Sequence, residues 1–286
     1  MKNIYKLAVL GGDLRLVHAA KRLAETGFSV SVYALAERIC KEDVREESAL
    51  SDALADADAV LLPVPLTRDG VHLFSLWKPA EILISEIFEN APRHAAILAG
   101  GADGFSEPRL YDYAKREDFA RKNAIPTAEG ALLLALEALS ETIHGLSVGI
   151  IGFGRVAREC AALFHRLDAK ITVFARRKEA RNEASREGFA AFPVSSLFEY
   201  AQSFRLLINT VPARVIDEKT LSALSEDALL LELASKPYGA DPERATEMGV
   251  HMLLGGALPG KYFPKTAGII IADTVTDMLR EIFDLT

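Results

Sequence analysis

A short glycine-containing segment near the middle of the chain has the spacing of a phosphate-binding turn. It follows the pattern G-x-G-x-x-A directly after an apolar run at residues 148–151. In this pattern Gly152 permits a tight turn, Gly154 lets a pyrophosphate approach the backbone because it has no Cβ, and Ala157 lets a helix pack closely on the sheet. The first N–H groups of that helix attract phosphate. The predicted phosphate-binding residues are Gly152, Phe153, Gly154, Arg155 and Val156.

The segments around this turn have the lengths that a nucleotide-binding unit requires. Residues 148–151 are predicted to form a buried parallel strand, residues 156–167 an amphipathic helix and residues 171–174 a second strand. A glycine motif in this context, within about 30 residues, indicates a Rossmann unit. The alternative is an ordinary strand–helix turn, and the surrounding elements favour the cofactor.

The end of the second strand indicates which nicotinamide cofactor binds. NAD sites usually have Asp or Glu there, bonded to the ribose 2′-hydroxyl. This chain has Arg176 and Arg177 instead. A guanidinium suits a 2′-phosphate because it is planar, always charged and able to bind in bidentate fashion. We therefore expect NADP (NADP⁺/NADPH), with Arg176 as the stronger candidate; the alternative is that both arginines are solvated at a helix start.

Two later strands of the same domain are expected to end beside the cofactor. They cover residues 206–209 and 229–233 and are followed by short polar and small residues. Parallel strands present their carboxyl ends at one edge, where the nucleotide lies. The predicted lining residues are Asn209, Thr210, Val211, Pro212, Ala234 and Ser235.

Composition narrows the class of protein. The chain has 286 residues, half of them hydrophobic, which suits two domains with separate cores. A net charge of −7 argues against nucleic acid as a partner. Cys40 and Cys160 lack metal-site spacing, so we expect no metal and two reduced thiols in a cytoplasmic protein. No secretion signal and no apolar run long enough for a membrane span are expected.

The beginning of the chain repeats the glycine unit. A shift of 141 positions superimposes residues 6–10 and 29–33 on the two strands described above, with a helix expected over residues 15–25. Asp13 replaces the glycine that would touch the pyrophosphate, and a carboxylate there repels phosphate. It is better suited to cap the helix. We therefore expect a Rossmann-like sheet without nucleotide, whose crevice remains available to a substrate.

The alternation of strands and helices predicts an α/β fold. We expect two Rossmann-like domains with parallel sheets, joined by two helical segments and separated by a cleft. Residues 1–122 plus 266–286 form the predicted substrate or partner domain, and residues 123–265 form the NADP domain with a linking helix.

The linking helix is expected over residues 131–140. Thr127 is its predicted N-cap, and Gly145 is expected to end it. Residues 111–121 are predicted to be a charged surface segment.

Several segments, in the same order along the chain, resemble the A subunit of dipicolinate synthase. They are LAVLGGDLR, IPTAEG, TIHGLSVGIIGFGRVA, INTVP, LELASKPYGAD and LPGKYFPKTAG. The resemblance spans nearly the whole chain and departs at Lys236, where the family pattern suggests Arg. More distantly, the layout is similar to that of 2-hydroxyacid dehydrogenases and shikimate dehydrogenase.

The resemblance implies a reaction and a partner. It implies oxidation of dihydrodipicolinate to dipicolinate (pyridine-2,6-dicarboxylate), with NADP as hydride acceptor, alongside the B subunit of dipicolinate synthase during endospore formation. The implied location is the cytoplasm of the mother cell, and a homodimer is left open. The resemblance implies no particular catalytic residue.

The implied reaction needs cations for two carboxylates and a base for one proton. The candidate substrate-binding residues are Arg15, Thr127, Lys236, Lys265 and Thr266. The candidate catalytic residues are Glu129, His144 and Lys265, with Asp13 as a further base. For each there is a simpler alternative: a solvent-facing cation, a helix-dipole role for Glu129 in a first turn, or a helix-end role for His144.

Two other functions stay open. A 2-hydroxyacid or shikimate-type NADP dehydrogenase requires an acid such as His with a carboxylate partner, and no such pair is evident in the sequence. A non-catalytic NADP-binding regulatory subunit would bind NADP without turnover. The sequence lacks Ser-His-Asp, zinc and Walker patterns, so hydrolase and kinase functions have little support.

Overall fold

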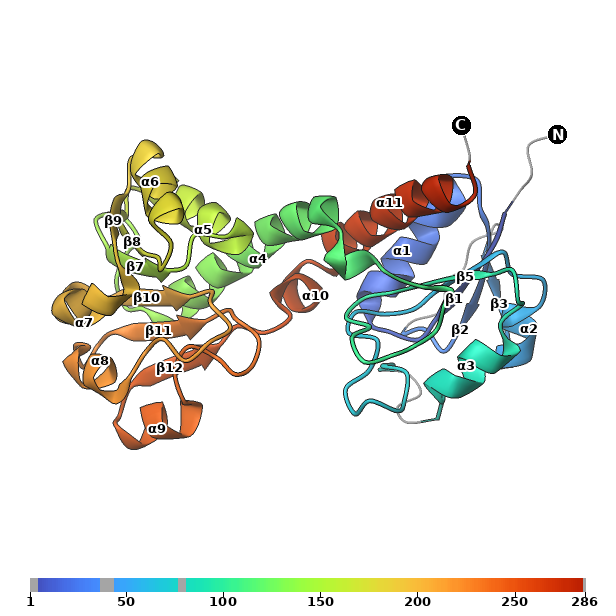
Figure 1. Cartoon of the computed structure of the whole chain (residues 1–286), viewed down its shortest axis with the longest axis horizontal. Helices are drawn as coiled ribbons and strands as arrows, with labels where there is room; N and C mark the ends of the chain where they lie inside the picture. Colours follow the sequence, from blue (N-terminus) through green and yellow to red (C-terminus); the bar gives the residue numbers. More distant parts are fainter. Residues whose placement is uncertain (1–4, 37–43, 77–80, 285–286) are drawn as a thin grey trace. The chain divides into compact units, whose positions relative to one another are not determined.

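The computed structural model describes residues 5–36, 44–76 and 81–284. The chain forms two compact units (Figure 1). Unit 1 comprises Met1–Asn123 and Pro259–Thr286, and unit 2 comprises Ala124–Leu258. The chain therefore returns to unit 1 at Pro259, a few residues before the limit expected from the sequence. Gly260 explains this limit, because a Cβ at that position would lie 2.8 Å from Nε of Arg15 in unit 1.

Unit 1 contains a six-stranded parallel sheet. Its strands are β1 (Lys6–Leu10), β2 (Ser29–Tyr33), β3 (Val44–Glu46), β4 (Ala59–Leu61), β5 (Ala96–Ala99) and β6 (Leu110–Asp112). Its helices are α1 (Leu14–Glu25), α2 (Leu50–Leu54), α3 (Ile84–Asn90) and α11 (Pro264–Ile282). Two further helices, α4 (Glu117–Ala138) and the short α10 (Leu258–Tyr262), contain the unit boundaries.

Unit 2 contains a second six-stranded parallel sheet. Its strands are β7 (Ser147–Ile151), β8 (Lys170–Phe174), β9 (Ala190–Phe192), β10 (Leu206–Asn209), β11 (Leu229–Glu232) and β12 (His251–Leu254). Its other helices are α5 (Arg155–Arg166), α6 (Lys178–Arg186), α7 (Leu197–Tyr200), α8 (Glu218–Ala223) and α9 (Pro242–Glu247). The prediction of two Rossmann-like parallel sheets is confirmed.

Both sheets have the same doubly wound strand order. It is β3-β2-β1-β4-β5-β6 in unit 1 and β12-β11-β10-β7-β8-β9 in unit 2. In such sheets ligands bind outside the carboxyl ends of the strands, where the strand order reverses. This rule points to the ends of β1 and β4 in unit 1, and to the ends of β7 and β10 in unit 2.

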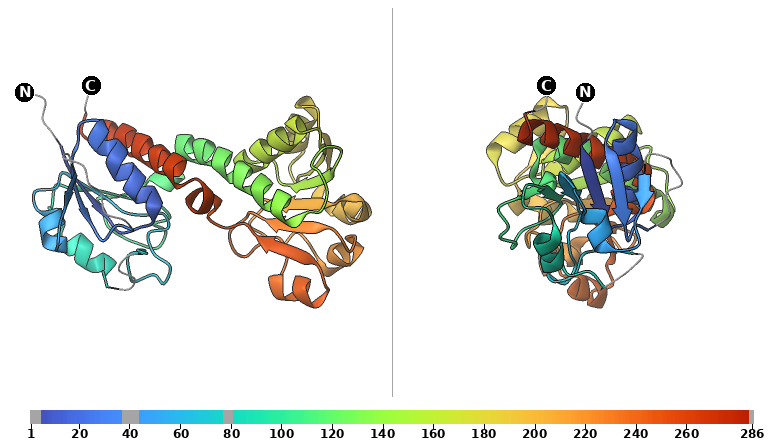
Figure 2. Two further views of the ribbon diagram at one scale, coloured as in Figure 1. Left: turned by 180° about the vertical axis from the view of Figure 1, so that it is seen from behind. Right: turned by 90° about the vertical axis from the view of Figure 1, so that its right-hand side faces the viewer.

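Alternate residues of each strand face opposite layers of helices. In unit 1, Leu7 and Val9 share a core with the buried residues of α1 and α11. Ala8 and Leu10 share a second core with α2 and α3. Figures 1 and 2 show α1 and α11 side by side, in blue and red, on one face of this sheet. Strands that are apolar on both faces are typical of such three-layer folds.

The two units repeat one another in detail, as the sequence predicted. The bounds of β7, α5 and β8 are those of β1, α1 and β2 displaced by 141 residues. The same backbone hydrogen bond closes each turn: Gly11 N–H donates to the Tyr33 carbonyl (3.0 Å), and Gly152 N–H donates to the Phe174 carbonyl (2.8 Å). Both glycines have positive φ, which a side chain disfavours.

The linking helix differs from the prediction. α4 begins at Glu117, and Pro126 lies inside it, so Thr127 is not an N-cap. The charged residues expected to form a surface segment are the end of β6, a 3₁₀ turn and the solvent face of the first helical turns. The helix continues because Phe119, Ala124 and Ala128 bury an apolar stripe, which outweighs the one hydrogen bond that Pro126 cannot donate.

The end of this helix also lies elsewhere. α4 stops at Ala138, so Gly145 is not its C-cap. Gly145 instead has a positive φ in the turn before β7, where its N–H donates to the Asp168 carbonyl (3.0 Å). Gly145 therefore stabilises the turn that leads into β7, and it does not end α4.

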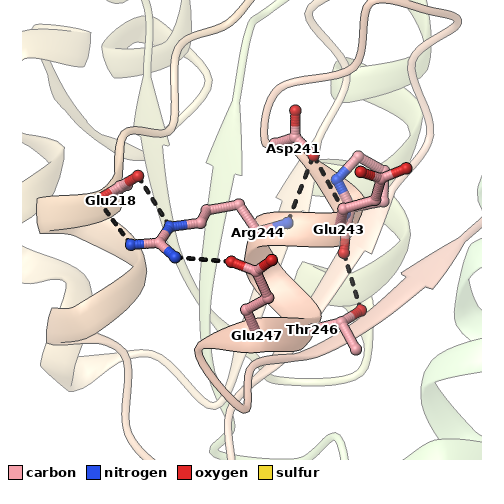
Figure 3. A network of polar contacts seen from close by, with 7 residues as sticks. Glu218, Asp241, Glu243, Arg244, Thr246 and Glu247 are labelled. Carbon is pink, nitrogen blue, oxygen red and sulfur yellow. Dashed lines mark hydrogen bonds and ion pairs between the residues drawn. The ribbon is translucent and has the colours of Figure 1, made fainter.

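A polar network connects α8 and α9 in unit 2 (Figure 3). The Arg244 guanidinium donates to Glu218 at 2.8 Å and to Glu247 at 2.6 Å. Asp241 caps α9 by accepting from the backbone N–H groups of Glu243 and Arg244. The network fixes the helix that begins where the loop after β11 ends.

The structure tests the prediction for one of the two predicted thiols. Cys40 lies outside the described residues. Cys160 is buried in α5, and burial raises the pKa of its thiol to about 12, so the group is protonated and unreactive. Within the described residues, no helix combines the length and apolar character required to cross a membrane.

Candidate functional site

The glycine turn of unit 2 is built by the end of β7 and the start of α5. Gly152 has a φ of +98°, and a Cβ there would lie 2.5 Å from Oγ1 of Thr210. Thr210 donates its hydroxyl to the Ile151 carbonyl (2.8 Å), which joins the loop after β10 to the turn. The turn therefore requires glycine for both conformation and space.

Gly154 leaves the start of α5 open. It is the N-cap residue of this helix, with extended backbone (φ −86°, ψ −166°) and no side chain to accept from the first N–H groups. A Cβ at Gly154 would have no neighbouring atom within 4 Å. These are the conditions under which a pyrophosphate can contact the backbone and the positive end of a helix. The residues present thus fit a dinucleotide.

The equivalent position in unit 1 is closed. Asp13 adopts the same extended conformation (φ −113°, ψ −166°) and accepts from the backbone N–H of Arg15, which confirms the expected N-cap. The Arg15 guanidinium also binds the Asp13 carboxylate at 2.8–3.1 Å and donates to the Val64 carbonyl. An internal carboxylate thus satisfies the helix start that phosphate would occupy.

The two arginines at the end of β8 are exposed. Arg177 is the N-cap residue of α6, and Arg176 precedes it. Within the part of the chain that the structure describes, neither side chain has a polar partner, whereas Arg181 donates to the carbonyls of Ala175 and Arg176 and fixes the strand end. The strand end therefore presents two uncompensated positive charges.

A buried carboxylate that sequence reasoning missed organises the loops after β10 and β11. Glu232 is 1 % exposed. Its Oε1 accepts from Asn209 Nδ2 (2.7 Å) and Ala234 N–H (2.9 Å), and its Oε2 accepts from Gly239 N–H (2.7 Å). Burial raises the pKa of the Glu232 carboxyl above its ordinary value, although these hydrogen bonds oppose the increase. The signal available in the sequence was a single carboxylate at the end of an apolar strand.

Asn209 completes this network. Its side chain binds both the carbonyl and the N–H of Val211, at 3.0 and 3.1 Å. A Cβ at Gly239 would lie 2.4 Å from Asn209 Nδ2, so that glycine is required for the close approach. The predicted lining segments at 209–212 and 234–235 are therefore held by one shared set of hydrogen bonds, with Pro212 and Ser235 exposed.

The predicted catalytic residues do not converge within either unit. Glu129 is exposed on α4, twelve residues after its first residue, so the first-turn dipole role is wrong. His144 lies in the turn before β7 rather than at a helix end, and its ring is 3.4 Å from the exposed Asp168 carboxylate. No hydrogen bond or ion pair joins Glu129 to His144 in the described part of the chain.

The predicted substrate-binding residues are divided between the units. Lys236 is exposed in the loop after β11, and Thr127 is half-buried on α4. Lys265 and Thr266 are exposed in the first turn of α11 in unit 1. Arg15 is the exception, because its side chain is only 11 % exposed and already paired with Asp13.

Two family models cover most of the chain. Residues 6–120 match the N-terminal domain of the dipicolinate synthase A subunit. Residues 127–235 match the D-isomer specific 2-hydroxyacid dehydrogenase, NAD binding domain. Unit 2 is thus a dehydrogenase-type domain for a nicotinamide cofactor. This match supports the general class of oxidoreductase for the chain and does not specify the reaction.

Similar proteins and structures extend the match over the whole length. The dipicolinate synthase A subunit of Bacillus subtilis (strain 168) is 29% identical over 293 residues, covering 97% of this chain and 96% of the relative. The crystal structure of the same enzyme's A chain from Bacillus subtilis has a TM-score of 0.89 at 28% identity, covering 100% of this chain and 99% of the other. The crystal structure of the A subunit from Bacillus halodurans has a TM-score of 0.87 at 28% identity, covering 98% and 99%.

These findings agree with the motifs along the sequence, from LAVLGGDLR at residues 7–15 to LPGKYFPKTAG at residues 258–268. Residues 6–120 therefore belong to the N-terminal domain family of the dipicolinate synthase A subunit, and the whole chain is a relative of that protein.

Proposed function

We propose that the chain oxidises dihydrodipicolinate to dipicolinate with NADP⁺, acting with the B subunit of dipicolinate synthase in endospore formation. The whole-length similarity to the A subunit supports the reaction and the partner. The observation that carries the cofactor assignment is the open helix start at Gly154 beside a strand end that bears two unpaired arginines. A mother-cell location follows from the same similarity.

When bound, NADP⁺ supplies the hydride acceptor. The chain contributes the position of that acceptor: the first N–H groups of α5 bind the pyrophosphate, and Arg176 pairs with the 2′-phosphate. The loops held by Glu232 and Asn209 line the remainder of the cofactor and exclude water from it. The N–H groups of α5 and the loops held by Glu232 and Asn209 are fixed by the fold before the cofactor arrives, which lowers the entropic cost of binding.

The dicarboxylate substrate requires cations. Lys236 in unit 2 and Lys265 in unit 1 have exposed side chains without an ion-pair partner among the described residues, and Thr127 and Thr266 can donate hydrogen bonds. We include these four residues in the proposal as carboxylate-binding groups. The paired Arg15 keeps only part of its guanidinium available.

Cofactor choice is tested by titration. Wild type should bind NADP⁺ more tightly than NAD⁺, and Arg176→Ala should weaken NADP⁺ by about 1–3 kcal/mol while leaving NAD⁺ unchanged, because only NADP⁺ carries the 2′-phosphate. Arg186→Ala, at the exposed far end of α6, is the matched control. Equal wild-type affinities for the two cofactors would contradict the assignment to Arg176.

The reaction is tested by absorbance. Freshly generated dihydrodipicolinate and NADP⁺ should yield dipicolinate and NADPH in equal amounts, with and without the partner protein as separate arms. Binding of NADP⁺ without turnover in both arms would instead support a non-catalytic regulatory subunit.

A further inference from the structure

Unit 1 contains a pocket of its own at the carboxyl edge of its sheet. The pocket has a volume of about 270 Å³ and is formed by the loop that follows β4. This loop packs on the end of β1: Gly12 N–H donates to the Phe74 carbonyl (2.7 Å), and Leu76 N–H donates to the Gly12 carbonyl (3.1 Å). The pocket therefore lies where the strand order of this sheet reverses, between β1 and β4.

At about 270 Å³ the pocket is too small for a dinucleotide. A Cβ at Gly11 would lie 2.7 Å from Leu73 Cδ2 and 2.9 Å from the Phe74 carbonyl, so residues 73–76 cover the turn. The equivalent Gly152 of unit 2 is crowded in the same way by Thr210, and the two turns differ instead at the helix start, which Asp13 closes in unit 1 and Gly154 leaves open in unit 2. What remains in unit 1 has the size of a small ring acid.

A histidine–carboxylate pair lines this pocket. His72 Nδ1 lies 2.7 Å from Asp69 Oδ2, and Asp69 Oδ1 also accepts from the backbone N–H groups of Val71 and His72 at 2.9 and 2.8 Å. These hydrogen bonds, those from His72 foremost, hold the pKa of the Asp69 carboxyl well below its usual range. An ionised Asp69 fixes the proton of a neutral imidazole on Nδ1.

The other ring nitrogen is available to a ligand. His72 Nε2 has no partner among the residues that the structure describes, and the side chain is 32% exposed at the pocket. This is the arrangement of a general base: one nitrogen oriented by a carboxylate, and the other directed to solvent or substrate. Asp69 and His72 thus form a His–carboxylate pair, which the sequence analysis did not identify.

A cation lies beside this pair. The Arg68 guanidinium stacks over the Phe74 ring, with its carbon 4.3 Å from the ring centroid. Arg68 forms no ion pair within the described part of the chain, and both residues line the pocket. A guanidinium held flat on an aromatic ring and lacking a carboxylate partner is suited to bidentate binding of a carboxylate.

We propose that this pocket binds a small ring carboxylate, that Arg68 pairs with the carboxylate, and that His72 Nε2 accepts the proton released on oxidation, with Asp69 positioning the imidazole. This inference rests on the proposed function and assigns the base that the sequence left open. The charged and titratable groups around His72 in the pocket are Arg68 and Asp69. Asp13, the carboxylate that follows β1 at this edge, is already paired with Arg15.

The proton and electrons of the step balance. A bound oxidised nicotinamide would accept one ring hydrogen of dihydrodipicolinate together with the electron pair of its C–H bond, as hydride. The C–H bond on the neighbouring ring atom breaks with its proton passing to His72 Nε2, and its electron pair enters the new aromatic system. The imidazolium then returns its proton to solvent after the product leaves.

The test uses the full-length protein with its partner and two matched controls. His72→Gln should lower kcat by about 10²- to 10⁴-fold and leave dipicolinate affinity within about threefold. Arg68→Gln should weaken dipicolinate binding, measured by calorimetry, by about 10- to 100-fold. His94→Gln and Arg93→Gln, exposed just before β5 at the opposite edge of the sheet, should change neither quantity.

Chemical rescue separates a base from a structural role. Added imidazole should restore part of the kcat of His72→Ala, because the ring in wild type is partly exposed and its space can be refilled; a structural histidine would show no rescue. Unchanged kcat in His72→Gln, or lost kcat without rescue, overturns the assignment of the base. Unchanged dipicolinate affinity in Arg68→Gln overturns the carboxylate site.

Failure of the proposed function gives a different result. A wild type that forms no dipicolinate in either arm overturns the function, whereas a wild type that turns over while His72→Gln is equally active overturns only the base. The calorimetric arm needs no turnover, so it decides on the pocket in both cases.

Discussion

At the scale of single residues, the most constrained groups of unit 2 are buried ones that hold the binding loops. Glu232 connects Asn209, the last residue of β10, with Ala234 and Gly239 in the loop after β11. A buried carboxylate with three donors is costly to alter, because any replacement leaves a donor unsatisfied. The loops that are expected to contact the cofactor therefore depend on a residue that need not touch it.

Replacing Glu232 by Gln should destabilise the protein by about 1–3 kcal/mol, since the amide N–H₂ would face one of the three donors. Denaturant unfolding measures the change, and Glu226→Gln, exposed before β11, is the control. NADP⁺ affinity should fall as well. An unfolding midpoint equal to that of wild type would show that the network does not contribute to stability.

The pH dependence of this effect has a definite sign. The folded-state pKa of Glu232 is raised above the ordinary value of 4.5, so the folded protein binds more protons than the unfolded chain in the interval above 4.5. The contribution of Glu232 to the free energy of unfolding therefore falls as pH rises through that interval. The stability difference between wild type and Glu232→Gln should be larger at pH 4.5 than at pH 7.5; a difference that grows with pH would contradict the raised pKa.

Residue roles were only partly predictable from the sequence. Gly152, Gly154 and Asp13 were identifiable because their roles follow from local turn geometry. Glu232 was not, because its side-chain partner Asn209 is on another strand, and neither was His72, because nothing in the sequence shows that the loop after β4 folds onto the end of β1. Chemistry that depends on contacts between loops is not encoded in local spacing.

At the scale of elements, the repeated strand–turn–helix unit provides its own comparison. Asp13 and Gly154 are equivalent N-cap positions with ψ of −166° in both, and they differ in whether a side chain occupies the helix start. In unit 1 a carboxylate closes this turn, and in unit 2 the same turn is open to an external anion.

Gly154→Asp should therefore stabilise unit 2 and abolish its cofactor binding. The aspartate has space and a compatible backbone, so capping α5 should stabilise the protein by roughly a few tenths of a kcal/mol, while its charge repels the pyrophosphate. Thermal unfolding and NADP⁺ titration measure the two effects. Gly154→Asn caps without charge and should retain more affinity; tight NADP⁺ binding by Gly154→Asp would mean that the turn is not a phosphate site.

Element prediction succeeded where apolar periodicity was clear and failed where it was masked. The strands β1, β2 and β10 have the predicted bounds, because β1 and β10 are apolar over most of their length and β2 alternates serine with valine. The start of α4 was missed because its first turns carry charged residues outward and Pro126 resembled a helix start. The short edge strands β3, β6 and β9 were not predicted, since three residues that are mostly exposed or half-buried carry too little apolar pattern.

At the scale of the whole molecule, unit 1 is discontinuous in sequence and unit 2 is not. α11 supplies Ile271, Val275 and Leu279 to the core that α1 shares with the sheet of unit 1. Gly268 allows the two helices to approach, because a Cβ there would lie 2.4 Å from the Arg15 carbonyl. The last helix is therefore part of the first sheet's core.

Core substitutions should act on one unit at a time. Leu279→Ala should cost about 2–5 kcal/mol and accelerate hydrogen exchange in β1, β2 and β4, while exchange in β7 and β10 and the affinity for NADP⁺ stay unchanged. Leu230→Ala, equally buried in unit 2, should do the reverse. Uniform acceleration in both sheets by either variant would show that the units unfold together.

The late position of α11 also sets an order on the ribosome. Every strand and helix of unit 2 is translated before residue 264, whereas the apolar face formed by α1 and its sheet stays uncovered until α11 has been synthesised. Unit 2 can thus acquire its native fold while the apolar face of unit 1 remains exposed to solvent until α11 has been synthesised. In a nascent chain, the part made first is completed last.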